Sequence, residues 1–163
     1  PRSFRDLVLE VVPDQVTLVP DAHDAITSNA GWDTVANKEF LSGLCDLFHS
    51  KGIRVSIFID PVPEMAISAR ACGADRVELY TESYAARYAA GPAAAIAPYL
   101  RTAEAAREAG LGLNAGHDLN LDNLAYFIRT IPWTDEVSIG HAIVCDALYL
   151  GLENTIKEYL ARI

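Results

Sequence analysis

Basic residues are scarce in this sequence. The chain carries 13 Lys and Arg against 22 Asp and Glu, which gives a formal net charge of −9. A protein that binds a nucleic-acid backbone or an anionic membrane surface needs clustered Lys and Arg. Neither partner is therefore expected. Any anion that the chain binds must be held locally, by backbone amides and a few well-placed side chains.

Long apolar runs and paired cysteines are also lacking. No apolar run is long enough to cross a bilayer, and no basic segment followed by an apolar one marks an export signal. We therefore expect a cytoplasmic protein. Cys45, Cys72 and Cys145 are odd in number and widely spaced in apolar, helix-like segments. They are predicted to be free, mostly buried thiols of a reducing compartment, and there is no zinc-binding pattern.

What the sequence does contain is a regular alternation of two kinds of segment. Short apolar runs predict strands over residues 15–19, 54–60, 76–80, 111–115 and 137–140. Amphipathic or alanine-rich segments predict helices over residues 3–12, 37–50, 64–72, 93–109, 121–131, 142–150 and 152–163. Residues 21–35 and 81–92 are predicted to be long loops. Asp60, followed by Pro61, is expected to cap the next helix.

A helix followed by five strand–helix units predicts an α/β fold with a parallel sheet covered by helices. An open doubly wound sheet and a closed barrel both fit this order. No Gly-x-Gly-x-x-Gly or phosphate-binding Lys motif follows a strand, which argues against a nucleotide-binding doubly wound sheet. Polar residues near the ends of different strands favour the barrel. These residues are Thr27, Asp60, Glu78, His117 and His141.

The spacing of the units indicates the size of the whole fold. Five units in 163 residues is about one per 30, so eight would need roughly 250 residues, the usual size of a (β/α)8 TIM barrel. Residues 1–163 are therefore interpreted as a single domain that supplies the last five units. The chain starts at Pro1 rather than Met, and three units are expected to be absent on the N-terminal side.

A few polar positions are candidates for chemistry. Glu78 lies within an apolar strand, and a carboxylate there is more easily explained by function than by a salt bridge beneath a covering helix. His117 follows a strand end next to Gly116, a position suited to acid–base catalysis. Gly140 and His141 open a helix whose amides could hold a phosphate, although His141 could equally be a capping or packing residue. Thr27 could bind a phosphate oxygen or simply form a turn.

Two motifs, Asn114-Ala115-Gly116-His117 and Ile139-Gly140-His141-Ala142-Ile143, carry a family resemblance. Together with the segments at 15–20, 26–33, 55–60 and 77–81, they resemble pyridoxine 5′-phosphate synthases, the PdxJ family. The resemblance implies a (β/α)8 barrel that condenses 1-deoxy-D-xylulose 5-phosphate with 3-amino-2-oxopropyl phosphate. The products would be pyridoxine 5′-phosphate, inorganic phosphate and water. It implies no metal or organic cofactor, and a homo-oligomer, an octamer in the family.

The resemblance also implies roles for individual residues. His117 is the proton donor, and Glu78 is the carboxylate that stabilises the transition state. Thr27 contacts deoxyxylulose phosphate, whereas Gly140 and His141 bind aminoacetone phosphate. Asp118 stands at another position that binds aminoacetone phosphate, where the family often has glycine. A carboxylate near a phosphate is unfavourable unless it turns away and only the backbone N–H is used.

The resemblance also has a gap. The family's first three strands carry an Asn-x-Asp-His segment, a catalytic histidine and a catalytic glutamate, and these have no counterpart in this sequence. A chain of these residues alone is therefore expected to be inactive and to expose an open sheet edge. Two alternatives stay open: another phosphosugar-handling TIM-barrel lyase or isomerase, and an inactive truncated domain with only a structural role.

Overall fold

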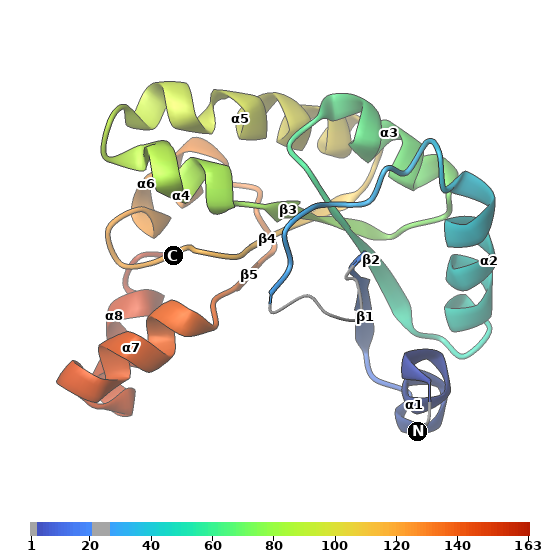
Figure 1. Cartoon of the computed structure of the whole chain (residues 1–163), viewed down its shortest axis with the longest axis horizontal. Coiled ribbons are helices and arrows are strands. Elements are labelled where there is room, and N and C mark those ends of the chain that lie inside the picture. Colours follow the sequence, from blue (N-terminus) through green and yellow to red (C-terminus); the bar gives the residue numbers. More distant parts are fainter. Residues whose placement is uncertain (1–2, 21–26) are drawn as a thin grey trace.

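The computed structural model describes residues 3–20 and 27–163, so positions 21–26 of the predicted 21–35 loop lie outside the described residues. All five predicted strands are present: β1 (Gln15–Leu18), β2 (Arg54–Ile59), β3 (Arg76–Tyr80), β4 (Gly112–Gly116) and β5 (Glu136–Ser138). They form one parallel sheet in chain order, β1-β2-β3-β4-β5, and the sheet is curled (Figure 1). A doubly wound sheet reverses its strand order. The structure is therefore a curled half-barrel.

The helices begin and end at α1 (Phe4–Val11), α2 (Lys38–His49), α3 (Pro63–Ala71), α4 (Glu82–Tyr88), α5 (Pro92–Glu108), α6 (Leu124–Thr130), α7 (His141–Leu150) and α8 (Leu152–Leu160). Helices α2, α3 and α5 cover the outer face of the sheet (Figure 1). Ser3 caps α1, because its Oγ accepts a hydrogen bond from the Asp6 amide at 3.2 Å. The helices α7 and α8 pack on each other beside the β5 edge.

The predicted loop over residues 81–92 is wrong, because its first part forms α4. A helix of seven residues is marginal by itself, so packing must stabilise it. Tyr84 supplies that packing. Its ring is fully buried against Tyr99 and Phe127, its amide donates to the Tyr99 hydroxyl, and its own hydroxyl donates to the Asn123 carbonyl at 2.7 Å.

The predicted capping role of Asp60 is also wrong. Helix α3 starts later than expected, at Pro63, and its N-cap residue is Val62. The Asp60 carboxylate instead accepts a hydrogen bond from the Gly31 amide, with 3.2 Å between N and Oδ2. Asp60 therefore holds the loop that follows β1 against the end of β2.

Strand residues alternate between the two faces of the sheet. The outward set, which includes Val55, Ile57, Val77, Leu79 and Leu113, is buried beneath the helices. Each such side chain contributes about 1.5–3 kcal/mol when it is fully removed from water. Because side chains in a strand point alternately to opposite faces, the residues between them point inward.

The inward face of the sheet is polar near the amino-terminal ends of the strands. Arg54 donates to Gln15 Oε1 at 2.7 Å and to Glu136 Oε1 at 2.9 Å. Gln15 and Asn114 donate to Glu136 Oε2, and Arg76 lies 3.2 Å from Glu136 Oε1. These contacts connect β1 with β5, which are the two ends of the strand order. We refer to these five side chains as the inner polar network.

Candidate functional site

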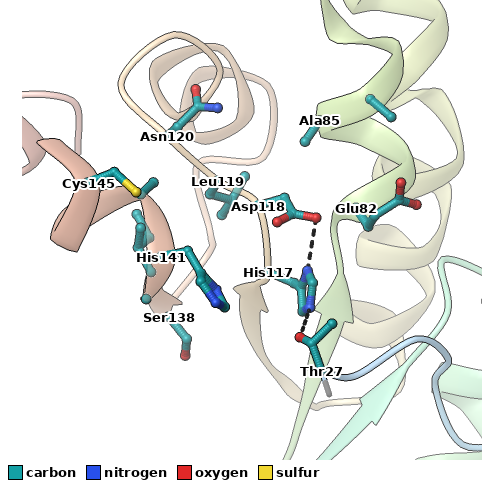
Figure 2. A pocket seen from close by; sticks show the side chains of 14 residues that line it. Thr27, Glu82, Ala85, His117, Asp118, Leu119, Asn120, Ser138, His141 and Cys145 are labelled. Carbon is teal, nitrogen blue, oxygen red and sulfur yellow. Dashed lines mark hydrogen bonds and ion pairs between the residues drawn. The ribbon is translucent and has the colours of Figure 1, made fainter. Parts of the chain in front are cut away.

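A cavity of about 920 Å³ opens at the carboxyl ends of the strands, between α4 and α7 (Figure 2). It is lined by Thr27, Glu82, Ala85, Ala86, His117, Asp118, Leu119, Asn120, Ser138, Ile139, Gly140, His141, Ala142 and Cys145. Five of the six predicted site residues are in this lining, and the exception is Glu78. The carboxyl ends of parallel strands are where ligand sites form in barrels, so this cavity is the candidate active site.

The imidazole of His117 stands at the centre of the site. Its Nε2 lies 3.0 Å from Thr27 Oγ1, although the two residues are 90 positions apart in the chain. Its Nδ1 lies 3.0 Å from Asp118 Oδ2, an ion-pair contact (Figure 2). The Tyr80 ring packs against the imidazole in an edge-to-face arrangement, with 5.0 Å between centroids. The ring is thus held from several sides and its orientation is fixed.

The backbone that carries this histidine is in an uncommon conformation. His117 and Asp118 have φ values of 79° and 57°, in the left-handed region that L side chains rarely adopt. Thr81 holds the segment from β3: its hydroxyl donates to the carbonyls of Gly116 and His117. The Asn123 side-chain amide donates to the Asp118 carbonyl at 3.2 Å. Strain of this kind persists only where surrounding contacts enforce it.

Glu78 is not part of the cavity lining. It lies inside the curled sheet, where it is only 8% exposed. Its Oε2 accepts a hydrogen bond from Thr17 at 3.2 Å. Burial raises the pKa of Glu78, and the nearby Glu136 adds to this, whereas hydrogen bonds with Thr17 and Ser138 lower it. Gly116 leaves room for this carboxylate, because a Cβ at position 116 would lie 2.5 Å from Glu78 Oε1.

The N-terminus of α7 forms another wall of the cavity. The helix runs over ten residues from His141, its N-cap residue is Gly140, and no side chain caps it. The first amides of a helix have no intrahelical partner, and the helix dipole favours an anion there. Gly140 and Ala142 both line the cavity, so this end of the helix can bind an anionic group such as a phosphate.

The model of the pyridoxal phosphate biosynthesis protein PdxJ matches residues 1–163, the whole chain. The chain belongs to the PdxJ family. Pyridoxine 5′-phosphate synthase of Bacteroides thetaiotaomicron is 63% identical over 157 residues, which are 96% of this chain and 66% of that protein. The synthase of Flavobacterium johnsoniae is 56% identical over 161 residues, 99% of this chain and 68% of that protein. The chain thus spans about two thirds of the length of these curated relatives.

The fold of this PdxJ-family chain also occurs in a distant protein. A crystal structure of a lactate oxidase from Pediococcus acidilactici superposes with a TM-score of 0.51 and 16% identity, over 77% of this chain and 33% of that one. At this identity the likeness concerns the fold alone.

Other features bear on which ligands this PdxJ-family chain can hold. Among residues 3–20 and 27–163, no group of three His, Cys, Asp or Glu side chains is arranged to hold a metal ion. No helix in that part of the chain is long and apolar enough to span a membrane.

Cys45 and Cys72 are free and buried, as predicted for most of the thiols, and burial raises the pKa of Cys45 to about 12. Cys145 is exposed and lines the cavity.

Sequence reasoning missed several residues at the site. Ser138 lies two residues before Gly140, and Cys145 lies one helical turn after His141. The Gly140-His141 motif could therefore have located both. Thr81 follows β3 directly, but nothing in its sequence context indicates that its hydroxyl reaches the neighbouring strand end. Asn123 is likewise recognisable only in three dimensions.

Proposed function

We propose that the full-length protein that contains this chain is a pyridoxine 5′-phosphate synthase. It condenses 1-deoxy-D-xylulose 5-phosphate with 3-amino-2-oxopropyl phosphate to form pyridoxine 5′-phosphate, inorganic phosphate and water. The observation that carries the proposal is the family match over residues 1–163 together with relatives that bear this enzyme name. The cavity at the strand ends, with its polar lining, is consistent with it.

Each predicted site residue has a role in this proposal. Condensation, dehydration and ring closure need protons at several oxygen atoms, and His117 is the group that donates one from Nε2. Glu78 stabilises the transition state from inside the curled sheet, where burial raises the pKa of its carboxyl group. Thr27 contacts the sugar phosphate. Gly140 and His141 bind the amino ketone phosphate through the N-terminus of α7, and Asp118 lies beside that second substrate.

The wider architecture belongs to the same proposal. Residues 1–163 form a single domain that supplies five βα units of a (β/α)8 barrel, and the remaining units come from outside these residues. The relatives are longer by about a third of their own length, which leaves room for such units. We further propose a cytoplasmic homo-oligomer that acts on phosphorylated small molecules.

The test uses the full-length protein and both phosphorylated substrates, with formation of pyridoxine 5′-phosphate as the readout. We expect wild-type turnover and a loss of about 10²–10⁴-fold in His117→Ala, the range typical of a lost general acid. His49→Ala is the matched control. His49, at the end of α2, contacts Asp75 outside the cavity, so its substitution should leave turnover unchanged. Near-normal turnover in a folded His117→Ala variant would contradict the role of His117, and a wild-type protein without synthase activity would contradict the function.

A further inference from the structure

We infer that Asp118 is a positioning residue for His117: its carboxylate takes the Nδ1 side of the imidazole, so that Nε2 faces Thr27 and the cavity. The inference rests on the proposed function for its kinetic consequence, but the geometry stands independently of it. In this role Asp118 orients His117 and does not bind phosphate. The carboxylate of Asp118 turns toward the histidine rather than toward the N-terminus of α7 (Figure 2).

The contact between these neighbours depends on the backbone. Consecutive side chains on a strand point to opposite faces, so an aspartate directly after a histidine does not ordinarily reach its ring. Here both residues have positive φ values, 79° and 57°, and the chain folds back so that Oδ2 comes within 3.0 Å of Nδ1. Left-handed conformations of this kind cost about 1–2 kcal/mol per residue. The hydrogen bonds from Thr81 and Asn123 hold the backbone in place against that cost.

The Asp118 carboxylate is the one charged contact of His117 Nδ1 within the described residues. This nitrogen is buried and, within residues 3–20 and 27–163, has no hydrogen-bond partner. The Asp118 carboxylate is its ion-pair partner, and that carboxylate is itself partly exposed, at 42% of its side-chain surface. The negative charge of a carboxylate 3.0 Å away favours a proton on Nδ1, although the two groups are not aligned as a hydrogen bond.

The consequence is a defined tautomer. With the proton of the neutral ring on Nδ1, Nε2 is an acceptor, and the Thr27 hydroxyl at 3.0 Å donates to it. When Nε2 takes up a proton, the ring becomes a cation beside the Asp118 carboxylate, and Nε2–H becomes the donor that points at Thr27 and the cavity. The charge of the carboxylate therefore sets which nitrogen exchanges the proton.

The experiment compares Asp118→Asn and Asp118→Gly with Asp122→Asn in the full-length protein. Asn and Gly both tolerate a left-handed conformation, so the substituted chains should fold. Asp122 is exposed on the same loop and outside the cavity lining, so its substitution removes the same charge without touching His117. The first readout is the ¹⁵N NMR spectrum of the neutral His117 ring, identified by its loss in His117→Ala.

We expect wild type and Asp122→Asn to show the Nδ1–H tautomer, and both Asp118 variants to show a mixture or the Nε2–H form. The second readout is steady-state kinetics: kcat should fall about tenfold in the Asp118 variants while KM changes little, because the lost contact acts on proton transfer. An unchanged tautomer in Asp118→Asn would overturn the inference. A lower KM for the amino ketone phosphate with the tautomer unchanged would overturn it too, and would mean that the carboxylate repels phosphate.

The tautomer readout needs no turnover, so the two proposals fail separately. A full-length wild type without synthase activity that still shows the Asp118-dependent tautomer refutes the proposed function and supports the positioning role. An active enzyme whose His117 tautomer ignores Asp118 refutes the positioning role and leaves the function in place.

Discussion

The substitution Gly31→Ala tests how the loop after β1 reaches the site. A Cβ at position 31 would overlap the backbone of the β2 end: it would lie 2.5 Å from Ile59 Cα and closer still to the Asp60 amide nitrogen. Ordinary carbon contacts are about 3.5–4.0 Å, so the loop must move away by about 1 Å. That movement weakens the hydrogen bonds from the Gly31 amide to Asp60 and from the Trp32 amide to the Phe58 carbonyl.

Overpacking costs about 1–3 kcal/mol, and the weakened hydrogen bonds add about 1 kcal/mol, so we expect a loss of about 3 kcal/mol in the free energy of unfolding. Turnover should also fall, because Thr27 lies four residues earlier and its hydroxyl would move away from His117 Nε2. The control is Gly43→Ala in α2, where a Cβ meets open space and alanine should stabilise the helix by up to about 1 kcal/mol. Urea unfolding of both full-length variants measures the effect. If Gly31→Ala were as stable and as active as wild type, the close approach of this loop to β2 would be refuted.

Two further predictions concern residues beneath the site. Thr81→Val removes the hydroxyl that donates to the Gly116 and His117 carbonyls and should cost about 2 kcal/mol in urea unfolding, whereas Thr81→Ser should retain most of that stability. Glu78→Gln should be more stable than wild type near neutral pH. The raised pKa of Glu78 means that its ionisation destabilises the folded state as pH rises above the unfolded value of about 4.3, so the difference should vanish in acid. Identical pH profiles of unfolding for Gln and Glu would contradict this.

The strands and most of the site could be predicted from the sequence because both depend on local pattern. The run Arg76 to Tyr80 alternates polar and apolar residues, and Glu78 falls on the inward face as its position implies. His117 and His141 follow successive strands of a parallel sheet, so their convergence on one cavity follows from topology alone.

The remaining features depend on contacts between distant segments. Helix α4 is stabilised by Tyr84 against Tyr99 and Phe127, which lie 15 and more residues away, and a pattern within residues 81–92 cannot reveal them. Asp60 and Pro61 have the composition of a helix start, but the Gly31 amide takes the carboxylate. The contact between Asp118 and His117 requires left-handed backbone at two residues that are not glycine, and only tertiary hydrogen bonds make that conformation available.

The inner polar network and the site are two ends of one inward-facing set of side chains. At the amino-terminal ends of the strands, Gln15 on β1 and Arg54 on β2 reach Glu136 on β5. Each ion pair there is partly exposed and contributes less than about 1 kcal/mol, and the contacts cross the inside of the curled sheet from β1 and β2 to β5. At the carboxyl ends of the strands, Thr27, after β1, lies 3.0 Å from His117, after β4. Both sets of contacts join segments that are distant in the sequence and that come together inside the same curled sheet.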